Sequence, residues 1–332
     1  MNQRPLLVVV AVLLGFIAWG GWNLMRGSSS GPTEVTPPKW EPVAASADEL
    51  RSALPSWAEA LPETALDPVS GLPTPVRDPR TGLIYVLVPA GETVIGDSFA
   101  AGYSNELARY EDPPSTEFLT TRFDEAFYLG REEVSFGQWK RYLAAQDPPL
   151  SLAPEAEQRL SAYPDDRPMI LVTRLEAASF AAWAGGRLPS ELEWEYASKG
   201  DAPKLRFPWG SNLDCGDARL QVDLEEIIGD DEAGLLARAL LPCGTSERDR
   251  SWCGARDLAG NAAEWIAVPW RLQVGRSTLE DAERPDLFAK YGAVVRGGSW
   301  ASPVGAGRCT QRDRLRDGER YDFVGFRVMR KP

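Results

Sequence analysis

The part of the chain from Phe207 to Pro332 limits the possible folds more than any other feature, because it lacks sustained hydrophobic periodicity. It is rich in glycine, tryptophan and turn-forming residues, and we find no internal repeat in the chain. We therefore expect a loop-rich region with short strands at Ala293–Arg296 and Gly325–Met329. The 332 residues, 43% of them hydrophobic, suffice for one large core.

More regular elements are expected ahead of this region. Ser190 and Glu193 form a capping-box pattern and Gly200 is a stop signal, so "RLPSELEWEYASKG" predicts a short helix. β-rich runs predict strands, and apolar residues at helical spacing predict two more helices. The expected strands are Leu83–Val88, Thr93–Gly96 and Phe127–Leu129. The first expected helix begins near Ser135, whose hydroxyl can cap it, and the second covers Leu175–Ala184.

The N-terminus carries an apolar run, Leu6–Met25, between Arg4 and Arg26. A helix of this length crosses a bilayer core of ~30 Å, so we expect a transmembrane anchor, with the remaining chain on the periplasmic or extracellular side. A cleaved signal peptide is the alternative. The run is longer than a usual signal-peptide core, and no small-x-small cleavage site follows it.

Composition divides the chain into three regions. Residues 1–26 form the expected anchor. Residues 27–81 are rich in proline and serine and predict an extended linker with a short helix, whose pattern is interrupted at Pro55. The compact domain is expected over residues 82–332.

The sequence contains no histidine, which excludes Ser-His-Asp triads, histidine relays and histidine-metal sites. It holds 36 Lys and Arg against 48 Asp and Glu, a formal net charge of −12. Attraction to phosphate backbones is disfavoured, so nucleic acid is not an expected partner. Any chemistry would have to use carboxylates, cysteine, tyrosine, lysine or arginine.

Cysteines occur in an even number, which suits two disulfides in an exported domain. Three connectivities are possible, and the short separation of Cys243 and Cys253 favours a local bridge, which leaves Cys215 with Cys309. Four buried free thiols are the alternative.

Seven sequence blocks follow one another in the order "VPAGETVIGD", "FYLGREEVSFGQWKRYL", "RLPSELEWEYASKG", "FPWG", "DLAGNAAEW", "VVRGGSW" and "VGFRV". In this order they resemble the sulfatase-modifying factor family, the domain of the formylglycine-generating enzyme, over roughly Leu83–Arg330. The resemblance implies an α+β, irregular C-type-lectin-like fold. The block aromatics Trp194, Trp265 and Trp300 are expected in its core.

The resemblance also implies a structural calcium ion. The positions that match the family's ligands are Asp257 and Glu264, with the backbone carbonyls of Gly260 and Ala262. Clustered carboxylate and carbonyl oxygens suit this cation, although Asp257 and Glu264 could instead be a turn cap and a solvated acid. A second family site matches Asp217 and the Ala218 carbonyl, and its other half is unassigned, with Asp230 or Asp231 as candidates.

Formylglycine generation in this family depends on two copper-binding cysteines that lie two and seven residues after the aromatic residue of the "RGGSW" block. Counting from Trp300, these places hold Ser302 and Gly307, which supply no thiolate. Cys309 is out of register. The resemblance therefore implies a member without the copper site, and the lack of histidine excludes the family's iron-dependent branch.

Two further groups have a functional and a structural interpretation. A third branch of the family works through a glutamate, and Glu191, Glu193 and Glu195 are available here, although structural roles are favoured for them. Arg308, Arg312 and Arg314 lie in "RCTQRDRLRDGERYDF", where family members carry groove residues. They could contact an anionic ligand or belong to a salt-bridged loop, and the loop is favoured.

These observations favour a membrane-anchored, noncatalytic member of the family that binds or scaffolds an envelope protein or a glycan. A divergent oxidoreductase of the envelope is the alternative. Calcium is the expected cofactor, and neither copper nor iron is expected.

Overall fold

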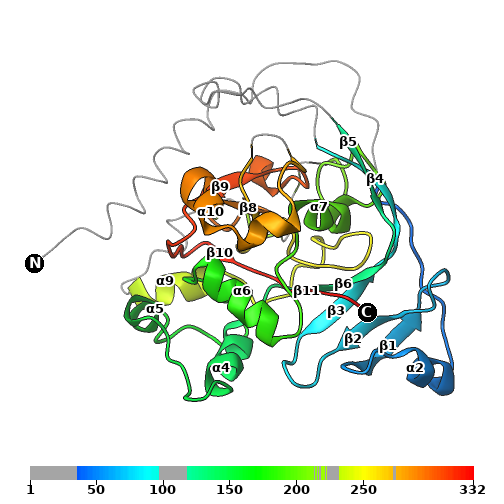
Figure 1. The fold of residues 1–332 in the computed structure, drawn as a ribbon, viewed down its shortest axis with the longest axis horizontal. Helices are drawn as coiled ribbons and strands as arrows, with labels where there is room; N and C mark the ends of the chain where they lie inside the picture. Colours follow the sequence, from blue (N-terminus) through cyan, green and yellow to red (C-terminus); the bar gives the residue numbers. More distant parts are fainter. Residues whose placement is uncertain are drawn as a thin grey trace, which may run out of the picture.

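The structure, a computed structural model, describes residues 36–96, 118–212, 214, 216, 218–220, 222, 232–271 and 274–332. Within these ranges, two main sheets of short strands are surrounded by helices and long loops (Figure 1). The predicted anchor, Leu6–Met25, lies outside the described residues. Among those described, no helix has the length and apolar character needed to cross a bilayer.

The first sheet has five strands in the order β1-β2-β3-β6-β11, all antiparallel pairs. Its inner strands β3 and β6 are buried along almost their whole length, which matches their continuous apolar sequences. The strands are β1 (Glu59–Leu66), β2 (Pro73–Arg77), β3 (Ile84–Val88), β6 (Phe127–Gly130) and β11 (Met329–Arg330).

The second sheet has the order β10-β7-β8-β9 and joins the block containing "AAEW" to the C-terminal blocks. Every residue of β7 is buried, and β7 pairs in parallel with β10 and antiparallel with β8. The strands are β7 (Ala263–Pro269), β8 (Ala293–Arg296), β9 (Asp313–Leu315) and β10 (Val324–Gly325). The predicted strand at 325–329 is thus split between β10 and β11.

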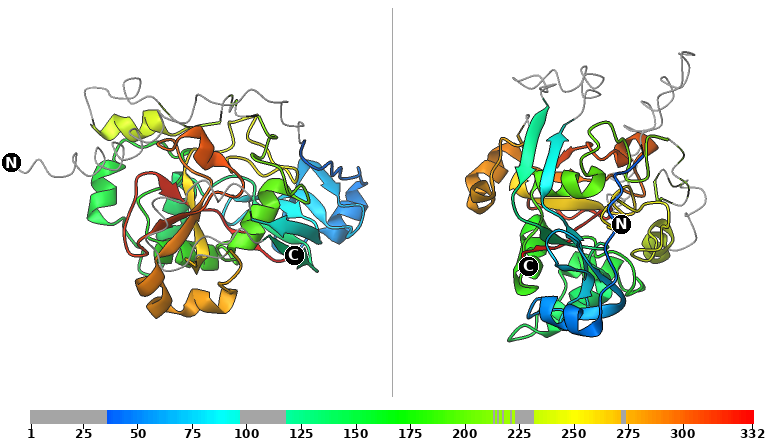
Figure 2. Two further views of the ribbon diagram at one scale, coloured as in Figure 1. Left: turned by 90° about the horizontal axis from the view of Figure 1, so that it is seen from above. Right: turned by 90° about the vertical axis from the view of Figure 1, so that its right-hand side faces the viewer.

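A separate hairpin of β4 (Gly91–Ile95) and β5 (Leu119–Phe123) stands off the body of the molecule (Figure 2). The hairpin contacts the helix Glu191–Lys199 and its C-cap residue Gly200. Thr93 Oγ1 donates to the Gly200 carbonyl at 2.5 Å, and the ring of Phe123 stacks on Tyr196 with 4.6 Å between centroids.

Capping boxes start α4 (Phe136–Ala144), α6 (Arg174–Trp183) and α7 (Glu191–Lys199), with Ser135, Thr173 and Ser190 as the N-cap residues. The predicted boundaries of α7, including its end at Gly200, are confirmed. The remaining helices are α2 (Ala47–Ala53), α5 (Pro154–Arg159), α9 (Glu232–Ala239) and α10 (Pro285–Tyr291), with 3-10 turns η2 (Leu279–Glu283) and η3 (Val304–Gly307).

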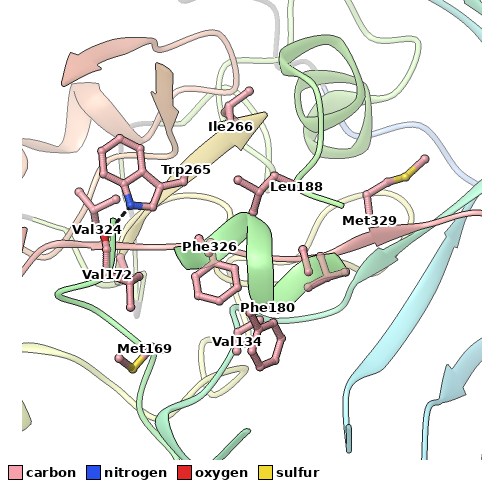
Figure 3. Close-up of a cluster of buried hydrophobic side chains, with 14 of the residues drawn as sticks. Val134, Met169, Val172, Phe180, Leu188, Trp265, Ile266, Val324, Phe326 and Met329 are labelled. Carbon is pink, nitrogen blue, oxygen red and sulfur yellow. Dashed lines mark hydrogen bonds between the residues drawn. The ribbon is translucent and has the colours of Figure 1, made fainter. Parts of the chain in front are cut away.

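The core lies where α6 packs against β7 and the C-terminal strands (Figure 3). Trp265 is fully buried there, and its indole Nε1 donates to the Val172 carbonyl at 3.0 Å. Trp194 and Trp300 are also buried, so the sequence prediction of core tryptophans is confirmed. Large aromatic side chains thus take the place of long regular elements in holding the loops together.

The predicted start of the folded domain at residue 82 is corrected by the structure. Strands β1 and β2 are hydrogen-bonded into the first sheet, and Trp40 meets the Trp252 ring edge to face, so packing extends at least as far back as Trp40. Trp57 meets the rings of Tyr85 and Tyr128 edge to face, at 5.3 and 5.4 Å, and the Arg330 guanidinium lies 4.0 Å from its ring. The sequence pattern predicted a linker here, because prolines separate the short apolar runs of these strands.

Candidate functional site

Ser302 and Gly307 lie on the loop that follows β8, at the places where the family carries copper ligands. Ser302 Oγ accepts a hydrogen bond from the Ser299 N–H at 3.0 Å and lies 3.1 Å from Ser299 Oγ. A Cβ atom on Gly307 would come 2.7 Å from Leu220 Cδ1 and 3.2 Å from Ala259 Cβ. The residues present therefore do not fit a cuprous ion, because neither position offers a thiolate, and a side chain at Gly307 would need Leu220 to shift.

Cys309, the nearest cysteine in sequence, is fully buried. Burial raises the pKa of its thiol to about 12, and the nearby Ser198 hydroxyl and Lys199 ammonium lower it only in part. The thiol is therefore neutral at physiological pH. Because metal binding and nucleophilic attack both need the thiolate, Cys309 is not a ready substitute for the missing pair.

Glu195, at the centre of α7, belongs to a buried charge network. Its Oε1 accepts from Lys199 Nζ at 2.6 Å, and its Oε2 accepts from Arg296 Nη2 at 2.5 Å. Burial raises the pKa of Glu195, but the two cations outweigh this and leave the pKa below its usual value. Glu195 is thus ionised and fully engaged, which suits a structural role and not a general acid.

The other two acids of α7 are engaged as well. Glu193 completes the capping box at Ser190 and forms a two-point ion pair with Arg187, at 2.8 and 2.6 Å. Glu191 is buried and accepts from Nε and Nη2 of Arg312. These contacts favour the structural interpretation of all three glutamates.

The arginine-rich segment after Cys309 is held by contacts within the protein. Arg312, besides its pair with Glu191, donates to the Arg271 carbonyl at 2.8 Å and lies over the Trp270 ring. Arg308 donates to the Gly305 carbonyl and to Gln311. Arg314 donates to the Lys290 carbonyl at 3.5 Å. The contacts favour the salt-bridged loop over a groove for an anion.

The turn from Asp257 to Glu264 has backbone that only a constrained turn adopts. Asp257 and Asn261 have φ of 55°, and Gly260 has φ of 109°. A Cβ atom on Gly260 would come 2.5 Å from the Arg219 carbonyl oxygen, so the site needs glycine for close approach as well as for its φ. Both Asp257 and Glu264 are buried behind this turn.

Arg327 supplies the positive charge that faces Glu264. Its guanidinium reaches Glu264 Oε2 and Oε1, and the indole of Trp194 donates to Oε2 at 2.7 Å. Arg327 Nη2 also donates to the carbonyls of Arg256 and Asp257 at 2.8 and 3.1 Å. As arranged here, both oxygens of Glu264, the predicted calcium ligand, accept hydrogen bonds from Arg327.

Besides Asp257 and Glu264, two more buried carboxyl groups, those of Glu133 and Asp249, lie at this turn. Burial, followed by the charge of Asp257, raises the pKa of Glu133. Burial raises the pKa of Asp257 to about 6 and that of Asp249 to about 8. Asp249 Oδ2 accepts from the Ala259 N–H at 2.6 Å, while Oδ1 has no hydrogen-bond partner in the part of the chain that the structure describes. Buried acid therefore exceeds buried base at this turn.

No group of three or more Cys, Asp or Glu side chains in the described ranges converges in a way that could hold a metal ion. For the second predicted site, Asp217, Asp230 and Asp231 lie outside those ranges, and the Ala218 carbonyl accepts from the Leu220 N–H at 2.9 Å. Both calcium sites stay predictions.

The structure corrects the predicted disulfide between Cys243 and Cys253, which are free thiols, as is Cys309. Cys253 Sγ lies 3.3 Å from Ser251 Oγ and 3.4 Å from the Ala197 carbonyl oxygen, so it faces α7. Cys243 instead lies beside the acidic groups of the turn, where burial and then Glu133 raise the pKa of its thiol. Cys215, the predicted partner of Cys309, is outside the described residues.

The whole of this arrangement falls inside one region of similarity to known proteins. Residues 73–332 match the sulfatase-modifying factor enzyme 1-like domain. The chain belongs to this family. The match includes β2 and therefore starts ahead of the sequence-based boundary at residue 82.

Relatives of this sulfatase-modifying-factor-like domain bear names of different activities. Hercynine oxygenase of Mycolicibacterium smegmatis is 29% identical over 303 residues, covering 78% of this chain and 64% of its own length. Formylglycine-generating enzyme of Streptomyces coelicolor is 28% identical, covering 69% of this chain and 82% of its own. The structure of PvdO from Pseudomonas aeruginosa covers 78% of this chain and 98% of its own, with a TM-score of 0.53 and 21% identity. The last likeness shows the shared fold.

Sequence reasoning missed the cations that organise this sulfatase-modifying-factor-like domain. Arg296, Arg327 and Lys199 are fully buried, and each faces a buried glutamate. One signal could have found two of them, because Arg296 ends the apolar run "AVVR" and Arg327 interrupts "VGFRV". A charge inside an apolar strand is tolerated only beside a partner.

Proposed function

We propose that this sulfatase-modifying-factor-like domain is a noncatalytic binding or scaffolding subunit of the cell envelope. The observation that carries the proposal is the lack of a thiolate at both copper positions. Ser302 and Gly307 occupy them, and Leu220 and Ala259 crowd the space beside Gly307. With Ser302 held by Ser299 at the first position, the copper chemistry of the formylglycine-generating enzyme has no ligands here.

Other chemistry finds little support among the remaining groups. The absence of histidine from the sequence removes the ligands and bases that an iron-dependent or hydrolytic site would use. The three glutamates of α7 are engaged by Arg187, Arg312, Arg296 and Lys199. What is left is a loop-rich surface on a rigid aromatic core, which suits recognition of a protein or a glycan.

The proposed location follows from the apolar run Leu6–Met25, which we take as a membrane anchor with the domain outside the cytoplasm. Resistance of the full chain to alkaline carbonate extraction would support the anchor. A phosphatase reporter fused after Pro332 should be active, since this reporter folds only after export. An inactive reporter would place the domain on the cytoplasmic side.

A divergent oxidoreductase is the second candidate, because relatives of this chain are named hercynine oxygenase and formylglycine-generating enzyme. It would act on a protein or small molecule in the periplasm. Such an activity would have to proceed without the family thiolates and without histidine.

Copper binding separates the two candidates. The full chain is reduced anaerobically, loaded with cuprous ion and challenged with a chromogenic cuprous chelator. The Streptomyces coelicolor enzyme serves as the positive control, and Cys309→Ser controls for stray thiols. We expect no copper retained and no oxygen consumed with a cysteine-containing peptide.

Two results would contradict the noncatalytic proposal. One retained copper per chain that Cys309→Ser abolishes would show that Cys309 becomes accessible and acts as a ligand. Oxygen consumption that requires the peptide, with or without copper, would favour the divergent oxidoreductase.

A further inference from the structure

A pocket of about 310 Å³ lies between α4, α5 and α6. Neither Ser302, Gly307 nor any residue of the Asp257–Glu264 turn lines it. Its volume falls near the lower end of the ~300–1,000 Å³ typical of small-molecule pockets. The pocket is therefore a candidate site distinct from the family's copper position.

The walls of the pocket are mainly apolar and aromatic. Side chains from α4, from the loop before α5 and from the segment that leads into α6 form them, namely Trp139, Tyr142, Leu143, Leu152, Met169 and Val172. Trp139 stacks on Phe180 with 5.7 Å between ring centroids, and Tyr142 meets Phe180 edge to face. The aromatic wall is thus fixed by the core behind it, which limits the ligand shapes that can enter.

One end of the pocket is polar but carries no net charge. Glu176 and Arg320 form a two-point ion pair there, and the Glu176 carboxylate also accepts from the Thr173 N–H at 2.9 Å. Burial raises the pKa of Glu176, and the bonds to Arg320 and Thr173 outweigh it and keep the carboxyl ionised. Three residues that carry hydroxyl groups, Tyr142, Ser151 and Ser179, also line the pocket, and Ser179 Oγ donates to the Leu175 carbonyl at 2.9 Å.

Two residues at the pocket, Leu150 and Leu171, have unusual environments for leucine. Leu150 at its rim is 51% exposed, which presents apolar surface to solvent beside the opening. Leu171 in its wall is buried with φ of 59°, a left-handed backbone that a branched apolar residue rarely adopts. Its carbonyl accepts from Arg320 at 3.2 Å, so the strained residue positions the ion pair.

We propose that this pocket binds a small neutral molecule with an aromatic or branched aliphatic body and a single hydroxyl or carbonyl group. The body lies against the apolar and aromatic walls, and the polar group meets the hydroxyls of Tyr142, Ser151 or Ser179. A charged ligand is disfavoured, because Glu176 and Arg320 already neutralise each other and would leave it buried without a counter-ion. The proposal goes beyond the proposed function and does not depend on it.

The test uses p-cresol as the probe and the full chain in lipid nanodiscs, with binding followed by saturation-transfer NMR. Ser179→Phe puts a ring at the exposed mouth of the pocket and should weaken binding at least tenfold. Leu175→Phe is the matched control, since Leu175 is on the same helix, 58% exposed and outside the pocket lining, and binding should not change. The control also corrects for probe dissolved in lipid.

Two further comparisons test the chemistry of the ligand. Tyr142→Phe should weaken p-cresol about three- to tenfold, as the loss of one neutral hydrogen bond does. The anion 4-hydroxybenzoate should bind at least tenfold more weakly than p-cresol.

The proposal is overturned if wild-type protein shows no saturable binding or if Ser179→Phe binds p-cresol as wild type does. Equal binding of 4-hydroxybenzoate would overturn the neutral-ligand assignment. The fold of each variant is checked by its urea unfolding curve. Should Ser179→Phe fail to fold, Ala153→Phe, which fills the pocket from its other side, carries the same expectation.

Discussion

Arg327 and Glu264 face each other as a two-point ion pair, with 2.7 Å between Nε and Oε2 and 2.5 Å between Nη2 and Oε1. Neither side chain exposes more than 1% of its surface. Arg327 also donates to the Gly130 carbonyl at 2.9 Å, so one guanidinium joins the end of β6, the turn before β7 and the C-terminal segment. The two sheets are thus connected through a buried charge.

Substitution Glu264→Gln should therefore destabilise the protein strongly. It removes the negative charge that contacts the Arg327 guanidinium directly. Breaking a buried ion pair costs about 3–5 kcal/mol, and the nearby carboxyl groups of Glu133 and Asp257 should place the loss at the lower end of that range. Urea unfolding of the full chain measures the loss. Asp124→Asn is the control, because the Arg122–Asp124 pair is 74% and 80% exposed and its loss should cost less than about 1 kcal/mol. Equal losses in the two variants would contradict the role given to the buried pair.

Substitution Gly307→Ala tests whether this position is closed. The added methyl group would press on Leu220 and Ala259, and overpacking of this kind costs about 1–3 kcal/mol. In a Leu220→Ala background the same substitution should cost clearly less, because the nearest contact is gone. The double-mutant cycle is measured by urea unfolding. Identical costs in both backgrounds would mean that Leu220 does not close the position.

Cys309 should be unreactive in the folded protein. Burial and the raised pKa of about 12 keep the thiol neutral and inaccessible at pH 7.5. Treatment with a maleimide reagent followed by peptide mass spectrometry should find Cys309 unmodified in native protein and fully modified in guanidinium. Rapid labelling of Cys309 in native protein would show that its thiol is accessible, and would make it a candidate metal ligand again.

The Asp249 carboxyl should make stability fall as pH rises. Burial lifts its pKa to about 8 in the folded state, against an ordinary value near ~3.9 in the unfolded chain. The folded protein alone holds this proton between those values, so the stabilisation is complete below pH ~4 and is lost as pH rises through about 8.

Asp249→Asn removes this dependence and keeps an acceptor for the Ala259 N–H. Relative to wild type, the variant should therefore be more stable at pH 8.5 than at pH 5. Urea unfolding at the two pH values gives the difference, and a stability difference independent of pH would show that Asp249 does not titrate in this range.

The calcium prediction has a direct thermal test. If the turn binds calcium, and the free calcium concentration is a hundred times the dissociation constant, chelation should remove about 2.7 kcal/mol of stability and lower the Tm. Asp257→Ala, which removes the side-chain oxygen, should leave the protein nearly unaffected by the chelator. If chelation leaves the Tm of wild-type protein unchanged, and that protein carries no residual metal, the turn binds no calcium and Arg327 alone pairs with Glu264.

The elements that the sequence predicts well are those whose signals are local. The capping box of Ser190 and Glu193 and the strand Ala293–Arg296 appear as predicted, because a few adjacent residues determine each. Strands β1 and β2 escaped prediction, since their pairing depends on a neighbour in another part of the chain and their prolines resemble a linker.

The site was harder to predict than the fold for the same reason. The positions of Ser302 and Gly307 could be counted from Trp300, but the contact of Gly307 with Leu220 spans 87 residues and depends on tertiary structure. The pairing of Arg327 with Glu264, 63 residues earlier, likewise has no local pattern. Sequence established what the copper positions lack, and the structure adds that Leu220 and Ala259 crowd the second position.

The early start of packing sets how far the domain could move from a bilayer. If Leu6–Met25 spans the membrane, no more than the chain from Met25 to Trp40 separates it from the folded body, because Trp40 packs on Trp252. A stretch of that length can reach no farther than about 55 Å, at ~3.6 Å per residue, whereas a linker ending at residue 82 would have reached about 200 Å. The domain could then bind a partner only within about one domain's breadth of the lipid surface. Proteins or glycans close to the membrane would therefore be favoured as partners.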